Sequence, residues 1–277
     1  MSKQTRKTII AGNWKMNKTR KAAQELAEAI VAACAKHNDL PEIVVCPPFT
    51  ALPEVLAAVK GSAVSTGAQN MDYHPSGAFT GEIAPPMLTD LAVKYVIIGH
   101  SERRQFFGET NASVNLKLKA ALEHKLVPIV CVGETLDERE SDLTDNVICH
   151  QVAAALADVA IESVDPIVFA YEPVWAIGTG KTCEATEANR VCHLIRSTID
   201  GYYQSSQKGA PAAEMVGNLI PVLYGGSVKA SNVDEILSKE DVDGALVGGA
   251  SLTVEDFLPL ILSAQKRKQG SLSKGAV

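Results

Sequence analysis

Three side chains in this chain have the chemistry for moving a proton. Glu172, His100 and Lys15 each lie at or just beyond the end of a short apolar run. A carboxylate can act as a general base, an imidazole can donate a proton to an oxygen, and a fixed ammonium can stabilise a developing negative charge. The sequence therefore offers a base, an electrophile and a cation, provided that the fold brings them together.

The runs that precede these residues recur along the whole chain. Each has four to six residues and is apolar almost throughout, as expected of strands that are covered on both faces of a parallel sheet. The eight runs are Thr8–Asn13, Glu42–Cys46, Ala63–Ala68, Tyr95–Ile98, Val127–Val132, Ile167–Tyr171, Pro221–Tyr224 and Gly244–Val247.

The segments between the runs have apolar residues at helical spacing. Examples are Ala22, Leu26, Ala29, Ile30 and Ala33 in the first segment, Val114, Leu118, Ala121 and Leu122 in the fourth, and Phe257, Leu260 and Ile261 in the last. Eight strand–helix units predict an α/β protein, a single (β/α)8 TIM barrel with eight parallel strands. Ser231 with Asp234, and Thr253 with Asp256, are spaced like helix capping boxes.

In such a barrel the active site forms where the strands end at their carboxyl termini. Polar or glycine residues at those ends are therefore the candidates for the site. They are Asn13 and Lys15 after the first strand, His100 and Glu102 after the fourth, Glu172 after the sixth, Ser227 after the seventh, and Gly248 and Gly249 after the eighth.

Length, charge and cysteine content limit the possible classes of protein. The 277 residues fit one barrel domain, 1–277, with a short flexible N-terminus at 1–7 and a frayed tail from about 266 to 277. Residues 204–218 predict a long loop or ragged helix. A net charge of −6 argues against nucleic-acid and membrane partners. Six cysteines without C-x-x-C spacing predict reduced thiols and a cytoplasmic protein.

Four stretches resemble motifs of the triosephosphate isomerase family. They are Gly12–Asn17, Gly99–Arg104, Ala170–Lys181 and Tyr224–Ser227, and the resemblance covers about residues 8 to 265. It implies interconversion of dihydroxyacetone phosphate and D-glyceraldehyde 3-phosphate through an enediolate, in glycolysis and gluconeogenesis. It also implies that no metal or coenzyme takes part.

The resemblance assigns a role to each polar candidate. Glu172 would be the base, with its basicity raised at the end of a buried strand, and His100 would be the electrophile. A helix beginning after His100 should lower the pKa of the ring and keep it neutral. Lys15 and Asn13 would contact the phosphate and the enediolate oxygens. Glu102 would orient Lys15 and His100.

By the same resemblance, a lid closes over the substrate. It comprises Pro173, Val174, Trp175, Ala176, Ile177, Gly178, Thr179, Gly180 and Lys181. The substrate phosphate would be held by backbone N–H groups of Gly178, Ser227, Gly248 and Gly249, whereas Gly225 and Gly226 would be turn residues. Cys131 would support Glu172 by packing, and Cys183, just past the lid, is expected to be more exposed and open to modification.

The segment from Gln69 to Glu82 resembles the loop by which one subunit of this family enters its neighbour. Thr80 lies in this dimer loop, so a homodimer is implied. Two other readings of the residues remain open. A barrel aldolase could use Lys15 as a Schiff-base nucleophile, and a non-catalytic barrel could merely bind a phosphate ligand.

Overall fold

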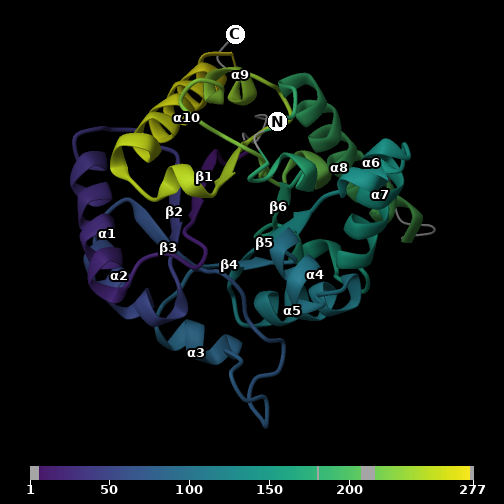
Figure 1. Ribbon diagram of the computed structural model, residues 1–277. Coiled ribbons are helices and arrows are strands. Elements are labelled where there is room, and N and C mark those ends of the chain that lie inside the picture. The colour runs from purple at the N-terminus through teal and green to yellow at the C-terminus, as the bar shows by residue number, and fades with distance from the viewer. Residues whose placement is uncertain (1–5, 180, 207–215, 275–277) are drawn as a thin grey trace.

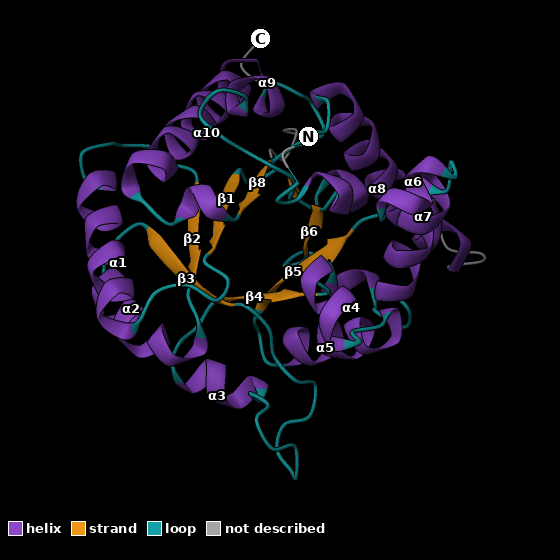
Figure 2. Ribbon diagram, in the orientation of Figure 1, coloured by secondary structure: helices purple, strands orange, loops and turns teal. Residues whose placement is uncertain are grey.

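The structure is a computed structural model that describes residues 6–179, 181–206 and 216–274, and within these residues eight parallel strands close into a barrel (Figure 2). The strands are β1 (Ile9–Asn13), β2 (Glu42–Cys46), β3 (Val64–Ala68), β4 (Tyr95–Ile98), β5 (Val127–Val132), β6 (Val168–Tyr171), β7 (Val222–Tyr224) and β8 (Gly244–Val247). The predicted barrel is confirmed. Four strands begin one residue later than predicted, at Ile9, Val64, Val168 and Val222.

Helices surround the barrel and cover the outer face of the strands (Figure 1). They are α1 (Arg20–Cys34), α2 (Leu52–Val59), α3 (Pro85–Asp90), α4 (Ser101–Phe107), α5 (Asn111–Glu123), α6 (Leu136–Glu140), α7 (Thr144–Ala155), α8 (Ala185–Ser206), α9 (Val233–Leu237) and α10 (Val254–Lys274). Short 3-10 turns are η1 (Phe49–Ala51), η2 (Ile161–Ser163), η3 (Val174–Ala176), η4 (Val216–Asn218) and η5 (Gly249–Ser251).

Alternate strand residues face two different cores. The inward side chains, among them Ile9, Ala11 and Ala170, form one small cluster inside the barrel, and their neighbours pack against the helices in a larger one. Because side chains alternate along a strand, residues two positions apart face the same side. Asn13 therefore faces inward like Ala11, and Glu172 faces inward like Ala170.

Helix packing confirms two of the three predicted apolar stripes and corrects the first. Val114, Leu118 and Ala121 are buried in α5, where Leu122 is half-buried against the same core, and Phe257, Leu260 and Ile261 are buried in α10. In α1 the buried residues are Ala23, Leu26, Ala27, Ile30 and Cys34. Ala29 is exposed. Alanine is common on both faces of this helix, so its spacing did not identify the buried face.

The predicted capping boxes had different outcomes. Thr253 accepts a hydrogen bond from the Asp256 backbone N–H at 3.2 Å and begins α10 as expected. The Ser231 box is wrong, because the residue before α9 is Asn232 and Asp234 accepts a hydrogen bond from Ser263 instead. The sequence between 204 and 218 is helical to Ser206 and forms a 3-10 turn from Val216; residues 207–215 lie outside the described part.

A buried carboxylate at the amino-terminal side of the barrel joins Arg6, at the start of the described chain, to α10. Asp243, which is 2% exposed, forms ion pairs with the guanidinium groups of Arg6, Arg196 and Arg267. Arg267 belongs to α10, which extends to Lys274. The prediction of a frayed tail from about residue 266 is therefore wrong as far as Lys274, and residues 275–277 lie outside the described part. Among the described residues, no helix combines the length and hydropathy needed to cross a membrane.

Candidate active site

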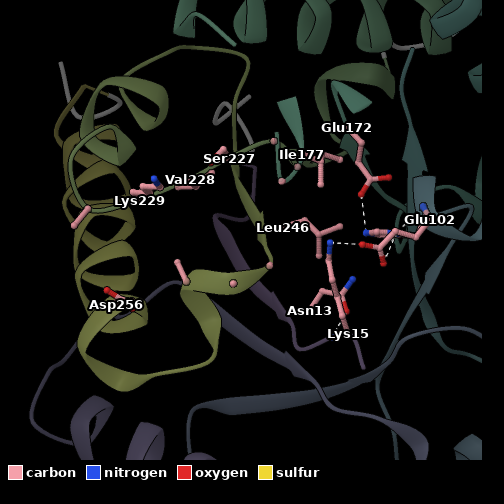
Figure 3. Close-up of a pocket in the computed structure, with 18 of the residues that line it drawn as sticks. Asn13, Lys15, Glu102, Glu172, Ile177, Ser227, Val228, Lys229, Leu246 and Asp256 are labelled. Carbon is pink, nitrogen blue, oxygen red and sulfur yellow. Dashed lines mark hydrogen bonds and ion pairs between the residues drawn. The ribbon is translucent and has the colours of Figure 1, made fainter. Parts of the chain in front are cut away.

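A cavity of about 720 Å³ opens at the carboxyl ends of the strands, as the barrel fold predicts. It brings together residues that are far apart in the sequence (Figure 3). The predicted site residues that line it are Asn13, Lys15, His100, Glu102, Glu172, Ile177, Gly178, Ser227, Gly248 and Gly249.

The Glu172 carboxylate is the most enclosed acidic group of this cavity. It is 2% exposed, lies 3.0 Å from His100 Nε2 and accepts a hydrogen bond from the Ser101 backbone N–H at 2.8 Å. Burial alone would raise the pKa of Glu172, but the contacts with His100 and Ser101 outweigh it and lower the pKa. The expected raised basicity is therefore wrong for the site without substrate. Ser101 was not anticipated, because its contribution is a backbone N–H.

The His100 ring caps the helix that follows it. Its Nδ1 accepts a hydrogen bond from the Glu102 backbone N–H at 3.2 Å, so the neutral ring has its proton on Nε2, which faces Glu172. The predicted helix start at Ser101 is confirmed. Burial lowers the pKa of His100, but the charge of Glu172 dominates and raises it. The expected lowering is wrong here, because the sequence did not reveal that Glu172 would rest against the ring.

Lys15 is held in position by its backbone as well as its side chain. Its φ of 51° lies in the left-handed region, which side chains adopt rarely. The N–H donates to Asn13 Oδ1 at 3.0 Å, and the carbonyl accepts from Gln69 Nε2 at 2.9 Å. The ammonium lies 2.5 Å from Glu102 Oε1, as Figure 3 illustrates. Gln69 was missed in this role because nothing in its local sequence indicates a long-range contact.

The two glycines after β7, Gly225 and Gly226, leave no room for a side chain. A Cβ at Gly225 would lie 2.8 Å from Glu172 Cγ, and one at Gly226 would lie 2.2 Å from the Tyr224 hydroxyl. The prediction that these two are ordinary turn residues is therefore wrong. Glycine at Gly225 permits the backbone to pass directly beside the carboxylate side chain.

Comparison with known proteins identifies the family. The triosephosphate isomerase family model matches residues 8–264. Triosephosphate isomerases of Clostridium tetani, Trichodesmium erythraeum and Alkaliphilus oremlandii are 49%, 50% and 51% identical over 256 residues. Each match covers 92% of this chain and 96%, 98% and 99% of the relative, respectively. The chain belongs to the triosephosphate isomerase family.

The segment that resembles the family's lid begins directly after Glu172. Ile177 and Gly178 line the cavity, and Gly178 has a φ of 70°. Within the segment, Thr179 Oγ1 donates to the Trp175 carbonyl at 2.7 Å and accepts from the Lys181 N–H at 3.2 Å. These bonds give the tip a local fold of its own. Gly180 lies outside the described residues.

The two cysteines singled out near the site are both buried. Cys131 is fully buried at the end of β5, and burial followed by the charge of Glu172 raises its pKa well above the usual value. Cys183 is 5% exposed, and burial raises its pKa to about 12. The expectation of an exposed, modifiable Cys183 is therefore wrong, because its side chain belongs to the main hydrophobic cluster between the barrel and the helices.

The cavity is also lined by residues that the sequence did not assign to the site. Leu246 points into its centre, and Lys229 and Asp256 line the wall opposite Glu102 and Glu172 (Figure 3). Leu246 is an inward strand position of β8, a signal that the alternation rule could have supplied. In the described part of the chain, no group of three or more His, Cys, Asp or Glu side chains is arranged to hold a metal ion.

Proposed function

We propose specific roles for these residues in the reaction of the triosephosphate isomerase family, which interconverts dihydroxyacetone phosphate and D-glyceraldehyde 3-phosphate in glycolysis and gluconeogenesis. The observation that carries the proposal is the pair formed by Glu172 and His100, whose Oε1 and Nε2 atoms are 3.0 Å apart in the cavity that also holds Lys15. A base and an acid at this spacing can serve adjacent atoms of one small substrate.

Glu172 removes the proton from the carbon next to the carbonyl, which gives the enediolate. To reach that carbon, its carboxylate must leave His100 and the Ser101 N–H. Both contacts lower the pKa of Glu172, whereas burial raises it. Release onto the substrate therefore leaves burial as the dominant influence, and the carboxylate becomes a stronger base at the moment it is needed.

His100 donates its Nε2 proton to the carbonyl oxygen as negative charge develops there. Its Nδ1 stays unprotonated because it accepts the Glu102 N–H. Lys15 adds a positive charge that Glu102 keeps in place, and Asn13 lies beside it on the same wall. These groups are oriented before the substrate arrives, so little reorganisation is needed during the reaction.

The phosphate occupies the part of the cavity formed by Gly178, Ser227, Gly248 and Gly249. All four line the same cavity, and η5 begins at Gly249, so that backbone N–H groups are available for an anion. Residues 173–181 act as a lid whose closure brings the Gly178 N–H to the phosphate and excludes water. The reaction requires no metal or coenzyme.

A coupled assay of glyceraldehyde 3-phosphate isomerisation in the presence of a chelator tests this proposal. Glu172→Asp withdraws the carboxylate by about 1.5 Å, one C–C bond. A displacement of that size is expected to lower kcat about a hundredfold with little change in KM. Absence of wild-type activity would refute the reaction, and a fully active Glu172→Asp variant would refute Glu172 as the base.

The aldolase alternative makes a different chemical prediction. A Schiff-base lysine needs its amine free to attack a carbonyl carbon, but Lys15 Nζ is held by Glu102 Oε1 at 2.5 Å. Borohydride reduction in the presence of dihydroxyacetone phosphate should leave the protein mass unchanged. A stable adduct on Lys15 would support the aldolase instead.

A homodimer is the proposed assembly. The loop between β3 and α3 extends away from the barrel in Figure 1 and contains Thr80, which is exposed. The loop is internally packed: the His74 and Phe79 rings stack at 3.9 Å, and the Asp72 N–H donates to the Ile83 carbonyl at 2.9 Å. A preformed loop loses little entropy on binding.

Exposed apolar side chains elsewhere on the surface also support an interface. Met16 is 97% exposed directly after Lys15, and Phe106 and Phe107 are 66% and 68% exposed at the end of α4. Large exposed apolar groups of this kind commonly mark a protein interface. Insertion of the loop into a second copy would cover them.

A charge placed in the dimer loop tests the assembly. Thr80→Arg should shift the protein from dimer to monomer in sedimentation velocity at micromolar concentration. Ser238→Arg, an equivalent change at the exposed end of α9, is the control and should leave the mass unchanged. A monomeric wild type would refute the dimer.

We further place the protein in the cytoplasm, as one barrel domain without nucleic-acid or membrane partners. Its six free cysteines support a reducing compartment.

A further inference from the structure

The first end of the lid is attached to the barrel through a buried carboxylate. Glu134 is fully buried, and its Oε1 accepts hydrogen bonds from Trp175 Nε1 at 2.8 Å and from the Tyr171 hydroxyl at 3.1 Å. Its carbonyl accepts from the Val174 N–H at 3.1 Å. These bonds restrain the edge of the indole ring and the backbone beside it, but they leave the face of the ring uncontacted.

Arg139, on α6, covers that face. Its guanidinium carbon lies 4.4 Å from the centre of the Trp175 ring, within the range of a cation–π contact. One of its nitrogens is 3.5 Å from the Glu134 carboxylate oxygen that holds the indole. The tryptophan is therefore held at its edge by Glu134 and on its face by Arg139.

The same guanidinium also contacts α8, the helix that follows the lid. Arg139 Nη1 lies 3.1 Å from Glu187 Oε1, in the first turn of α8. Only three residues separate Lys181, the last residue of the lid, from this helix. Glu187 is in turn fixed by Arg190 at 2.8 Å, and Arg190 pairs with Asp145 on α7. Helices α6, α7 and α8 lie together on one side of the barrel (Figure 1).

We propose that Arg139 is a positioning residue for the lid, because its guanidinium joins the indole at the first hinge to the helix that begins after the second. This inference rests on the proposed lid. Arg139 touches neither the cavity nor the Glu172 carboxylate in the described structure, so it acts on the reaction only through the lid. Its loss should weaken the grip on the phosphate and leave proton transfer to Glu172 intact.

Two substrates separate these effects. Glyceraldehyde 3-phosphate engages the lid through its phosphate, whereas D-glyceraldehyde offers only the reacting carbons. Arg139→Met keeps the aliphatic stem and removes the cation, and should lower kcat/KM for the phosphorylated substrate about tenfold. The value for D-glyceraldehyde should change by less than about twofold, because Glu172 and His100 stay in place. Arg139→Lys, which keeps the charge, should restore part of the loss.

Arg190→Met is the matched control, because it breaks a neighbouring arginine contact to Glu187 without touching the indole. Its effect on the phosphorylated substrate should be much smaller than that of Arg139→Met, because the contact between Arg139 and the indole is kept. Acrylamide quenching provides a second readout, since the other tryptophan, Trp14, is fully buried. Quenching of Trp175 should increase in Arg139→Met and stay unchanged in Arg190→Met.

Three results would overturn the proposal: equal losses on both substrates in Arg139→Met, no loss on either, or an equal effect of Arg190→Met. The lid itself is tested separately by deleting residues 176–179. If that deletion leaves the ratio of the two kcat/KM values unchanged, the lid proposal fails whatever Arg139 does.

Discussion

A single methyl group at Gly225 should displace the catalytic carboxylate. The backbone there is not in the left-handed region, so alanine can adopt it without strain, but its Cβ would lie 2.8 Å from Glu172 Cγ and 3.1 Å from the Tyr171 carbonyl oxygen. Ordinary van der Waals contact begins at 3.4 Å. Glu172 must therefore shift by at least about 0.6 Å, the difference between these distances.

A displacement of this size affects activity and stability differently. Misplacing a catalytic group by about 1 Å costs up to a hundredfold in rate, so Gly225→Ala should lower kcat by roughly ten- to a hundredfold with a nearly constant KM. Overpacking a buried site costs about 1–3 kcal/mol, which corresponds to a fall in Tm of roughly 5 °C for a chain of this size. Most of the protein should therefore remain folded at 25 °C.

The matched control is Gly201→Ala in α8, where an added Cβ meets nothing within 4 Å. It introduces the same methyl group and should raise stability by about 1 kcal/mol through helix propensity, with unchanged kcat. Steady-state kinetics and thermal unfolding of both variants decide the matter. If Gly225→Ala keeps kcat within threefold of wild type, Glu172 has more freedom than the packing indicates and the reasoning is wrong.

Three further outcomes follow from the structure. The pKa of His100 should lie above its ordinary value in the wild type and below it in Glu172→Gln, because burial remains when the carboxylate charge is removed; an NMR titration with no change between the two would contradict this. Asp243→Asn removes the buried carboxylate that Arg6, Arg196 and Arg267 share, and should lower the free energy of unfolding in urea by about 3 kcal/mol at constant m; a loss below 1 kcal/mol would count against that cluster. Deleting residues 176–179 should increase the release of methylglyoxal per turnover, and unchanged partitioning would exclude protection by the lid.

The charges of Glu172 and His100 make the stability of the folded chain depend on pH. Glu172 has a lowered pKa in the folded chain, so its contribution to stability is complete above its unfolded pKa and is lost as the pH falls through the folded value. His100 has a raised pKa, so its contribution is complete below its unfolded pKa and is lost as the pH rises through the folded value. The pair is therefore most stabilising between the two unfolded values, roughly pH 4.3 to 6.5.

The sequence predicted the strands well because each is an uninterrupted apolar run that periodicity alone can detect. It predicted the polar side chains at the strand ends for the same reason, since Asn13, His100 and Glu172 follow runs whose direction a parallel barrel imposes. The buried face of α1 was predicted poorly, because alanines such as Ala29 occur on both faces and do not distinguish core from surface.

The electrostatics of the site could not be read from single positions. The lowered pKa of Glu172 depends on the Ser101 N–H and on His100, both about seventy residues away in the chain. The need for glycine at Gly225 likewise arises only when β6 and β7 lie side by side. Such effects depend on distances between segments, and local sequence contains no record of them.

The pairing of β1 with β8 also determines when the fold can be completed. Ile9 pairs with Gly244, so the first strand to leave the ribosome waits for the last one, roughly 10 to 50 s at ordinary rates of synthesis. Throughout that interval the growing sheet has two open edges that could pair with another chain. At Gly244 a side chain would collide with the Ile9 carbonyl oxygen at 1.8 Å. The absence of a Cβ at this residue therefore lets the last strand enter the remaining gap and remove both edges in one step.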